Sequence, residues 1–431
     1  MPMWNEKEES LDLEERAQQQ WERLQSTLNR AYKNVPFYRN RFDRQKIDLS
    51  QMETREDLAG IPFTGREHFS ENYPYGLFAV PLRDVVRIHT AQGTGLRPVV
   101  SGYTRQDLHV WRELVARALS ASGVTRLDIL QIDLDPGLTN WGRDYKDGAE
   151  CTEAGVIPLT LLPPEKQLMV MRDYRTSVLV TTPSAAEQLA ELLFQSRLNP
   201  NELSLRTLIL VGEAPRGALQ DQLEEQLHVK SWVHYGLSEV PGPAIAFECE
   251  ERLGLHISED HFFAEVVDPA TGVPLPDGEE GELVLTTLTT KAFPLIRFRT
   301  GDRVKFLEGS CPCGRTLRRM QWLPRRTDDM LIIRGVKIHH HQILLFLERS
   351  LGFIPRSYRF LIKRHQLRDF LEIWVKVDEE IFSDEIKEME RFSRQLCAEM
   401  NQELGIPVQI RLKEGASFDP HWQTNRLEDL R

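Results

Sequence analysis

The sequence predicts an α/β protein with a large N-terminal domain and a small C-terminal α+β domain. A chain of 431 residues is too long for one typical hydrophobic core. Three short apolar runs, Val178–Val180, Leu208–Val211 and Trp232–Val233, are separated by segments with helical patterns. This alternation is typical of β-α-β units that build a parallel sheet. After Asp328 a second alternation of strand and helix patterns begins, and it predicts the smaller domain.

The first part of the chain predicts a supporting helix and one further strand. Apolar residues recur at helical spacing from Trp21 to Ala31 and stop before Pro36, which predicts an amphipathic helix. The stretch Leu127–Leu134 alternates apolar and polar residues, as a half-buried strand does.

Between the apolar runs we expect helices, the first capped by Ser184 and continuing to Leu193, the second over Pro215–Leu227. Ligands of parallel sheets bind at the carboxyl ends of the strands. The segments Gly212–Ala214 and Tyr235–Glu239 both follow predicted strands directly. The pattern alone therefore places a ligand site at these two segments.

The sequence pattern changes after Glu259, where short predicted strands alternate with turns rich in Gly, Pro and Asp. The expected strands are Phe263–Val267, Glu282–Thr287 and Leu295–Phe298. Short strands joined by tight turns predict an antiparallel, barrel-like subdomain within the N-terminal domain.

The C-terminal segment predicts a β-α-β-β-α-β order, which indicates a small domain of ferredoxin-like type. The expected elements are a strand at Met330–Ile338, a helix at about Ile343–Ser350, strands at Arg359–Lys363 and Leu371–Val377, a helix at about Asp384–Leu404 and a strand at Val408–Leu412.

Composition limits the classes of function. Hydrophobic content of 41% and charged content of 28% are ordinary for a soluble globular protein. A net charge of −11 argues against a nucleic-acid partner or an anionic membrane surface. No segment resembles a signal peptide or a transmembrane helix, and the five cysteines favour a reducing cytoplasm in which thiols are free or metal-bound.

Three motifs occur in order in the second half of the chain: His234–Glu239, Arg299–Asp302 and Arg326–Gly335. In this order and spacing they resemble the nucleotide-site motifs of adenylate-forming enzymes. The phenylacetate–CoA ligase branch is the best match, and the resemblance runs from about Tyr38 to the last residue.

The resemblance implies an enzyme that activates a small aryl or acyl carboxylic acid with ATP and transfers it to CoA. ATP or AMP, Mg²⁺ and CoA would be the cofactors, and a homodimer is left open. The N-terminal domain, residues 1–327, would hold the nucleotide and acyl sites. The C-terminal domain, residues 328–431, would be a mobile lid that turns about a hinge at Asp328.

The resemblance also assigns roles to single residues. Glu239 would be catalytic by holding Mg²⁺, since a hard cation prefers oxygen ligands. Tyr235 would stack on adenine, Asp302 would accept hydrogen bonds from the ribose hydroxyls, and Arg326 would contact ribose or phosphate. The remaining nucleotide-binding candidates in these segments are Gly212, Glu213, Ala214, Gly236 and Ser238.

Two positions depart from the family pattern. The phosphate loop keeps Gly93, Thr94 and a positive charge at Arg97, but Leu96 replaces the usual glycine. The second departure is Gln423, a catalytic candidate that stands where the family has its adenylating lysine. Losing one such electrostatic group costs a factor of about 10²–10³ in rate, so we expect slow adenylation.

The acyl pocket is expected to be lined by Val240–Pro243 and by Leu134–Gly148. Phenylacetate ligases tend to be glycine-rich and aromatic-rich in the second segment, whereas this chain is polar there. The pattern therefore does not name the acid.

A separate motif, Cys311-Pro312-Cys313-Gly314, places two thiols on a tight turn. Cys249 and His256 would complete a Cys₃His set for a structural Zn²⁺ ion. The alternative is a group of reduced thiols beside a surface histidine.

Two other classes of function stay open beside the ligase. One is a catalytically weakened paralogue that binds nucleotide or acyl-CoA as a regulatory or complex subunit. The other is an acyl transferase or thioesterase-like partner that acts on an acyl group activated elsewhere. Retention of Glu239, Asp302 and Arg326 favours nucleotide binding, while Gln423 and the altered phosphate loop favour these alternatives.

Overall fold

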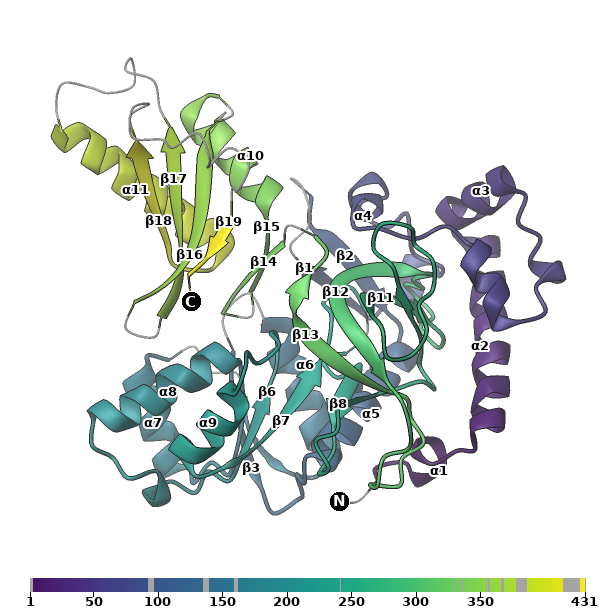
Figure 1. Cartoon of the computed structure of the whole chain (residues 1–431), viewed down its shortest axis with the longest axis horizontal. Coiled ribbons are helices and arrows are strands. Elements are labelled where there is room, and N and C mark those ends of the chain that lie inside the picture. The colour runs from purple at the N-terminus through teal and green to yellow at the C-terminus, as the bar shows by residue number, and fades with distance from the viewer. Residues whose placement is uncertain are drawn as a thin grey trace.

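The computed structural model shows a large N-terminal α/β part and a separate C-terminal α+β domain, which lies at the upper left of Figure 1. The predicted fold class is thereby confirmed. The structure describes residues 3–91, 97–134, 139–158, 162–240, 242–328, 330–334, 336–353, 355, 357–365, 368–376, 386–413 and 427–430.

One mixed sheet organises the N-terminal part. Across the described residues it has 11 strands in the order β10-β11-β12-β13-β9-β8-β7-β6-β5-β3-β4. These strands are β10 (Phe262–Val267), β11 (Glu280–Thr287), β12 (Phe298–Leu307), β13 (Arg319–Arg326), β9 (Leu255–Ile257), β8 (Ala246–Glu248), β7 (Lys230–Tyr235), β6 (Thr207–Leu210), β5 (Val178–Thr181), β3 (Ile129–Asp133) and β4 (Gly155–Ile157).

The strands from β7 to β4 pair in parallel, as the β-α-β pattern predicts. Every residue of β5 and β6 is buried. Their near-continuous apolar sequence follows from this burial, because helices cover both faces of a parallel sheet. Ligand-binding turns can therefore form only at the strand ends.

The antiparallel strands expected as a barrel-like subdomain belong to the same sheet. Strand β8 pairs antiparallel with β7, and β9, β13, β12, β11 and β10 continue from it. A strand expected at Leu295–Phe298 begins only at Phe298. This junction brings the end of β7 close to β12 and β13.

Helices pack on both sides of the sheet, and a two-stranded sheet of β1 (Arg87–Ala91) and β2 (Val99–Tyr103) lies beside it. The helices are α1 (Glu6–Glu9), α2 (Leu13–Asn34), α3 (Pro36–Gln45), α4 (Glu67–Glu71), α5 (Arg105–Ala121), α6 (Thr139–Cys151), α7 (Pro164–Asp173), α8 (Pro183–Gln195) and α9 (Leu219–Leu227).

The prediction that Ser184 caps α8 is wrong. The side chain of Thr182 accepts the capping hydrogen bond from the backbone of Ala185, and Pro183 takes the first helical position. Proline suits that position because its missing N–H would have no partner there. Ser184 is instead free to donate to Glu213 at the neighbouring strand end.

The C-terminal domain begins with a hairpin rather than with one strand. Strands β14 (Met330–Ile333) and β15 (Val336–His339) pair with each other, and Arg334 turns the chain with a φ of 55°. The sequence predicted one strand here because most residues from Met330 to Ile338 are apolar.

A four-stranded sheet, in the order β18-β17-β16-β19, carries the rest of the domain. Its elements are α10 (His340–Leu351), β16 (Tyr358–His365), β17 (Arg368–Lys376), α11 (Ile386–Leu404), β18 (Val408–Lys413) and β19 (Leu427–Asp429). The helices and sheet enclose a core of their own around Phe360, Leu371 and Met400. The domain therefore has the independent core that a separate unit requires.

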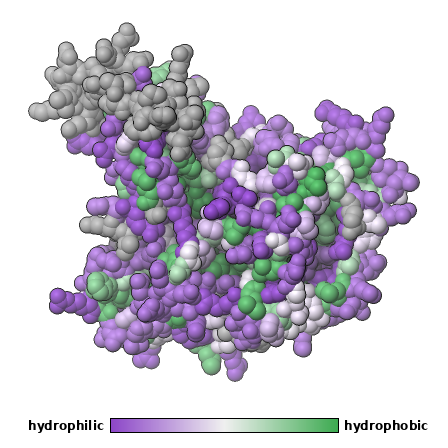
Figure 2. Space-filling model, in the orientation of Figure 1, coloured by the Kyte–Doolittle hydropathy of each residue, from purple (hydrophilic) through white to green (hydrophobic). Residues whose placement is uncertain are grey.

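On the face shown in Figure 2, hydrophilic side chains predominate and hydrophobic ones form small groups. No helix in the described part of the chain is long and apolar enough to cross a membrane.

A buried ion pair ties the N-terminal helices to the sheet. The guanidinium of Arg117 on α5 donates to both carboxylate oxygens of Asp260, each at 2.8 Å. Burial would raise the pKa of Asp260, but His261 and Arg117 outweigh it and the pKa is lowered. Removing one partner of such a pair leaves an uncompensated buried charge.

We therefore expect Arg117→Met to lower the free energy of unfolding by about 3–5 kcal/mol in chemical denaturation. The control is Arg349→Met, which removes an exposed ion pair with Glu403 and is expected to cost less than about 1 kcal/mol. Equal losses in the two variants would contradict this account of the core.

Candidate active site

A cavity of about 370 Å³ lies where the carboxyl end of β6, strands β12 and β13 and the C-terminal domain meet. Its walls include Glu213, Ala214, Asp302, Arg326 and Asp328. All five were predicted from the sequence as nucleotide-binding or hinge residues, and they come from three separate segments. The fold therefore gathers these predicted residues around one cavity.

Glu239 ends the turn that follows β7 and is buried. Arg66 Nε donates to its Oε1 at 2.9 Å. Burial would raise the pKa of Glu239, but Arg66 and Lys337 outweigh it and bring the pKa to about 2. Within the described part of the chain Oε2 has no hydrogen-bond partner. A buried, ionised carboxylate with one free oxygen fits a Mg²⁺ ligand.

Asp302 lies in β12 opposite Arg326 of β13. Its Oδ2 accepts a hydrogen bond from the Tyr235 hydroxyl at 2.7 Å, and its Oδ1 accepts from Arg326. The fully buried ring of Tyr235 packs edge-on against Trp322, with ring centroids 4.8 Å apart. Ribose binding by Asp302 and adenine stacking by Tyr235 stay predictions.

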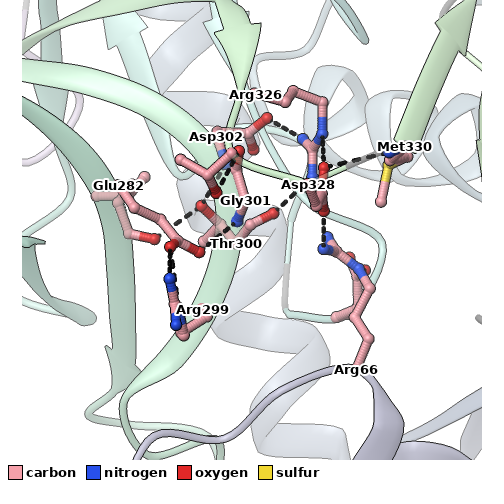
Figure 3. A network of polar contacts seen from close by, with 12 residues as sticks. Arg66, Glu282, Arg299, Thr300, Gly301, Asp302, Arg326, Asp328 and Met330 are labelled. Atoms are coloured by element: carbon pink, nitrogen blue, oxygen red, sulfur yellow. Dashed lines mark hydrogen bonds and ion pairs between the residues drawn. The ribbon is translucent and has the colours of Figure 1, made fainter. Parts of the chain in front are cut away.

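Arg326 links β13 to Asp328, which precedes the hairpin of the C-terminal domain, as Figure 3 shows. Its Nε donates to Asp328 Oδ1 at 2.7 Å, and its Nη2 donates to Oδ2 at 2.8 Å. Arg66 also donates to Asp328, at 3.1 Å. Gly301 has a φ of 76°, and a Cβ there would lie 2.3 Å from Asp328 Oδ2. The Thr-Gly-Asp turn therefore needs glycine at this position.

The segment after β6 also reaches the cavity. Gly212 adopts a φ of 87°, a conformation that favours glycine. The chain turns there, and Glu213 accepts a hydrogen bond from the backbone N–H of Ser184 at 3.0 Å. Glu213 and Ala214 then line the cavity, as the strand-end argument predicts.

The turn after β7 is tightly packed. Gly236 lies against Pro243, and a Cβ at Gly236 would stand 2.5 Å from the proline backbone. Ser238 is half-buried in the same turn. Close packing at Gly236 fixes the direction in which Glu239 enters the site.

The predicted phosphate loop and lysine position are largely outside the described residues. This applies to Gly93, Thr94 and Gln423. Arg97 is described, and its exposed guanidinium lies over the ring of Tyr73, 5.5 Å from the centroid.

Three residues of the site were not singled out from the sequence. Arg66, Trp322 and Lys337 lie in segments without a recognised motif, and each meets the site only through the fold. A buried carboxylate at Glu239 requires a positively charged partner, and this requirement could have predicted that a residue such as Arg66 lies beside it.

A second group of polar side chains lies buried near the residues that follow Glu239. The indole of Trp111 lies 3.5 Å from an ideal Cβ position on Gly242, and His89 packs edge-on against Trp111 with centroids 5.2 Å apart. His89 Nε2, Trp111 Nε1 and Asp144 Oδ2 have no hydrogen-bond partner among the described residues. Burial lowers the pKa of His89 to about 4 and raises the pKa of Asp144.

The four predicted metal ligands come together. One ligand atom from each of Cys249, His256, Cys311 and Cys313 can be chosen so that all lie within 4.8 Å of one another. Cys249 Sγ and Cys311 Sγ are 3.7 Å apart, and Cys313 Sγ is 3.4 Å from His256 Nε2. His256 Nδ1 lies 3.2 Å from the carbonyl oxygen of Leu317, which leaves Nε2 facing the thiols. This geometry fits a four-coordinate Zn²⁺ site.

Comparisons with known proteins agree with the fold. Residues 153–289 match the family of AMP-binding enzymes, and residues 335–431 match the C-terminal domain of AMP-binding enzymes. The chain is thus of the adenylate-forming class. Within that class it belongs to the phenylacetate–CoA ligase family.

The family assignment rests on curated relatives that match over most of the chain. The chain is 39% identical to the phenylacetate-coenzyme A ligase of Thermus thermophilus over 95% of both chains. It is 36% identical to the enzyme of the same name from Pseudomonas putida, over 92% of this chain and 90% of that protein. It is also 36% identical to the Escherichia coli enzyme of that name, over 98% of this chain and 97% of that protein.

A solved structure with a similar fold is 2-hydroxyisobutyryl-CoA ligase. Its complex with 2-HIB-AMP and CoA in the thioesterification state gives a TM-score of 0.89 at 26% identity, covering 98% of this chain and 91% of that one. The same ligase in the postadenylation state, with 2-HIB-AMP, gives a TM-score of 0.70 at 25% identity, covering 99% of this chain and 92% of that one.

We expect Asp302→Asn to weaken binding of AMP and ATP by about 1–3 kcal/mol in titration calorimetry, because it removes a charged acceptor beside Arg326. Asp277→Asn is a matched control, since Asp277 is exposed and pairs with Arg318. Unchanged nucleotide affinity in Asp302→Asn would show that this carboxylate does not bind nucleotide.

Proposed function

We propose that this chain activates a small carboxylic acid with ATP through an acyl-adenylate and transfers the acyl group to CoA. The observation that carries the proposal is the chain of charges from Glu239 through Arg66, Asp328 and Arg326 to Asp302, of which the last three line the cavity. Curated relatives over nearly the whole chain are named phenylacetate-coenzyme A ligase, which supports the same reaction.

The residues suggest how each part of the nucleotide is held. Asp302 would accept hydrogen bonds from the ribose, and Glu239 Oε2 would bind Mg²⁺. When bound, Mg²⁺ would neutralise the phosphates that repel the incoming carboxylate. Arg66 keeps Glu239 ionised, and Arg326 holds Asp302 in place through a hydrogen bond, so the site is preorganised before substrate arrives.

We propose that the acid carries a polar substituent. Trp111, whose buried Nε1 has no partner among the described residues, lies near Gly242, which is expected to line the acyl pocket, and His89 packs against Trp111. Asp144 Oδ2 is a further buried acceptor without a partner there, in the segment also expected to line that pocket. Buried polar groups without partners cost free energy, and a hydroxyl or amide on the acid would satisfy them. Plain phenylacetate would leave them unpaired.

A direct test incubates the protein with ATP, Mg²⁺, CoA and single acids, and measures AMP and the thioester by chromatography. Phenylacetate, its hydroxylated derivatives and short hydroxy acids form the panel. We expect AMP and thioester in equal amounts with at least one acid, and more with hydroxylated acids than with phenylacetate. If no acid of the panel gave AMP and thioester, that result would contradict the proposal.

The alternative of a weakened paralogue rests on Gln423, since glutamine carries no charge for the α-phosphate. We expect Gln423→Lys to raise the rate of pyrophosphate exchange by up to about 10²–10³. Gln409→Lys, on β18, is the control for an added positive charge on this domain. No gain in Gln423→Lys would show that another group already supplies the charge.

We further propose that Cys249, His256, Cys311 and Cys313 bind one structural Zn²⁺ ion that ties β8 and β9 to the loop before β13. Elemental analysis of untagged protein is expected to give about one zinc per chain. Cys313→Ala should lose that zinc and lower the melting temperature, whereas Cys151→Ala, at an exposed thiol, should do neither. Metal-free protein with an unchanged melting temperature would contradict the site.

A further inference from the structure

We propose that Lys337 is a catalytic residue of the thioester-forming step, in which its ammonium group stabilises the negative charge gained by the departing AMP phosphate. The inference rests on the proposed function and deepens it, because it assigns this cation to one of the two half-reactions.

The hairpin of the C-terminal domain delivers Lys337 to the site. Lys337 lies on β15 opposite Ile332 of β14, and Met330, Leu331 and Ile332 line the cavity. The nearest charges that act on its ammonium include those of Asp302 and Glu239. These are the two carboxylates that the proposed function assigns to the nucleotide and its metal ion.

The ammonium has no hydrogen-bonded partner in this arrangement. Lys337 Nζ is buried, and among the residues that the structure describes no group accepts a hydrogen bond from it. Glu239 Oε2 and Arg66 Nη2 are likewise buried without a hydrogen-bond partner. Burial lowers the pKa of Lys337, while Asp302 and Glu239 act to raise it. An unpartnered buried cation is costly, so its presence indicates a place for an anion.

Two other cations beside Glu239 and Asp302 are already engaged. Arg66 binds Glu239 and Asp328, and Arg326 binds Asp302 and Asp328. Both belong to the N-terminal part of the chain. Lys337 is a cation that the C-terminal domain adds to this group, and in this proposal it reaches the nucleotide only when the hairpin faces the cavity.

The arrangement of the domains points to the second half-reaction. The TM-score is 0.89 with 2-hydroxyisobutyryl-CoA ligase in the thioesterification state, and 0.70 with the same ligase in the postadenylation state. Lys337, on the strand that pairs with the cavity-lining residues of β14, is therefore held in an arrangement that resembles the thioester-forming one.

The chemistry of that step requires a cation at the phosphate. The CoA sulfur attacks the carbonyl carbon of the acyl-adenylate and forms the carbon–sulfur bond. The bond from that carbon to the phosphate oxygen breaks, the electron pair stays on AMP, and the thiol proton passes to water. AMP leaves with one more negative charge than its ester carried, so an ammonium beside it stabilises the transition state more than the ground state.

The test separates the two half-reactions in Lys337→Met, Lys337→Arg and the native protein. Adenylation is followed by ATP–pyrophosphate exchange with the best acid of the panel. Thioester formation is followed in single turnovers from a chemically prepared adenylate of the same acid plus CoA. Lys363→Met is the control, since Lys363 lies in the same domain and pairs with Glu372 at 3.0 Å.

We expect Lys337→Met to slow the single-turnover thioester step by about 10²–10³ and to leave pyrophosphate exchange within about twofold of the native rate. Lys337→Arg should restore much of the thioester rate, which a purely structural role would not require, and Lys363→Met should behave like the native protein.

Two results would overturn the assignment: an unchanged thioester rate in Lys337→Met, or an equal loss in both half-reactions. In either case the native protein would still form the thioester, so the proposed function would stand. A native protein that neither exchanges pyrophosphate nor converts the prepared adenylate would overturn both.

Discussion

The structure depends on an alternating chain of buried charges at the junction of its two domains. Arg66 joins Glu239 to Asp328, and Arg326 joins Asp328 to Asp302. Each charge has an opposite neighbour, which is the condition under which buried ions are tolerated. Because these ion pairs run from the N-terminal sheet to Asp328, just before the β14–β15 hairpin, they tie the candidate site to the domain junction. Two further residues contact this chain of charges. Tyr235 donates a hydrogen bond to Asp302, and Gly301 packs closely against Asp328 and Arg326.

The sequence predicts those parts of this arrangement that are local. The apolar runs that became β5, β6 and β7 predict the parallel sheet and the strand ends, and the motif residues Glu239 and Asp302 follow from their position and their resemblance to a family. Arg66 and Lys337 could not be found in this way, because each comes under the influence of Glu239 only across a large sequence separation. The β14–β15 hairpin was missed for a different reason, since its two apolar strands were treated as one although Arg334 and Gly335 stand between them.

The departures from the family pattern concern where positive charge is supplied. Gln423 would remove an ammonium from the adenylation step, and in our proposal Lys337, on the first hairpin of the C-terminal domain, supplies one at the thioester-forming step. Arg66 and Arg326 belong to the N-terminal part and bind carboxylates there, so in this proposal they do not distinguish the two steps. The Cys₃His cluster lies apart from these charges, and a metal there would stabilise the antiparallel strands that carry Asp302 and Arg326.

The central claim is that the acid is activated by bonding its own oxygen to the α-phosphate of ATP. The most direct measurement uses an acid labelled with oxygen-18 in its carboxylate, followed by mass spectrometry of the AMP formed with ATP and CoA. The account predicts that AMP carries one labelled oxygen in its phosphate for each thioester formed. Thioester formation with unlabelled AMP, or with ADP and phosphate in place of AMP, would contradict it.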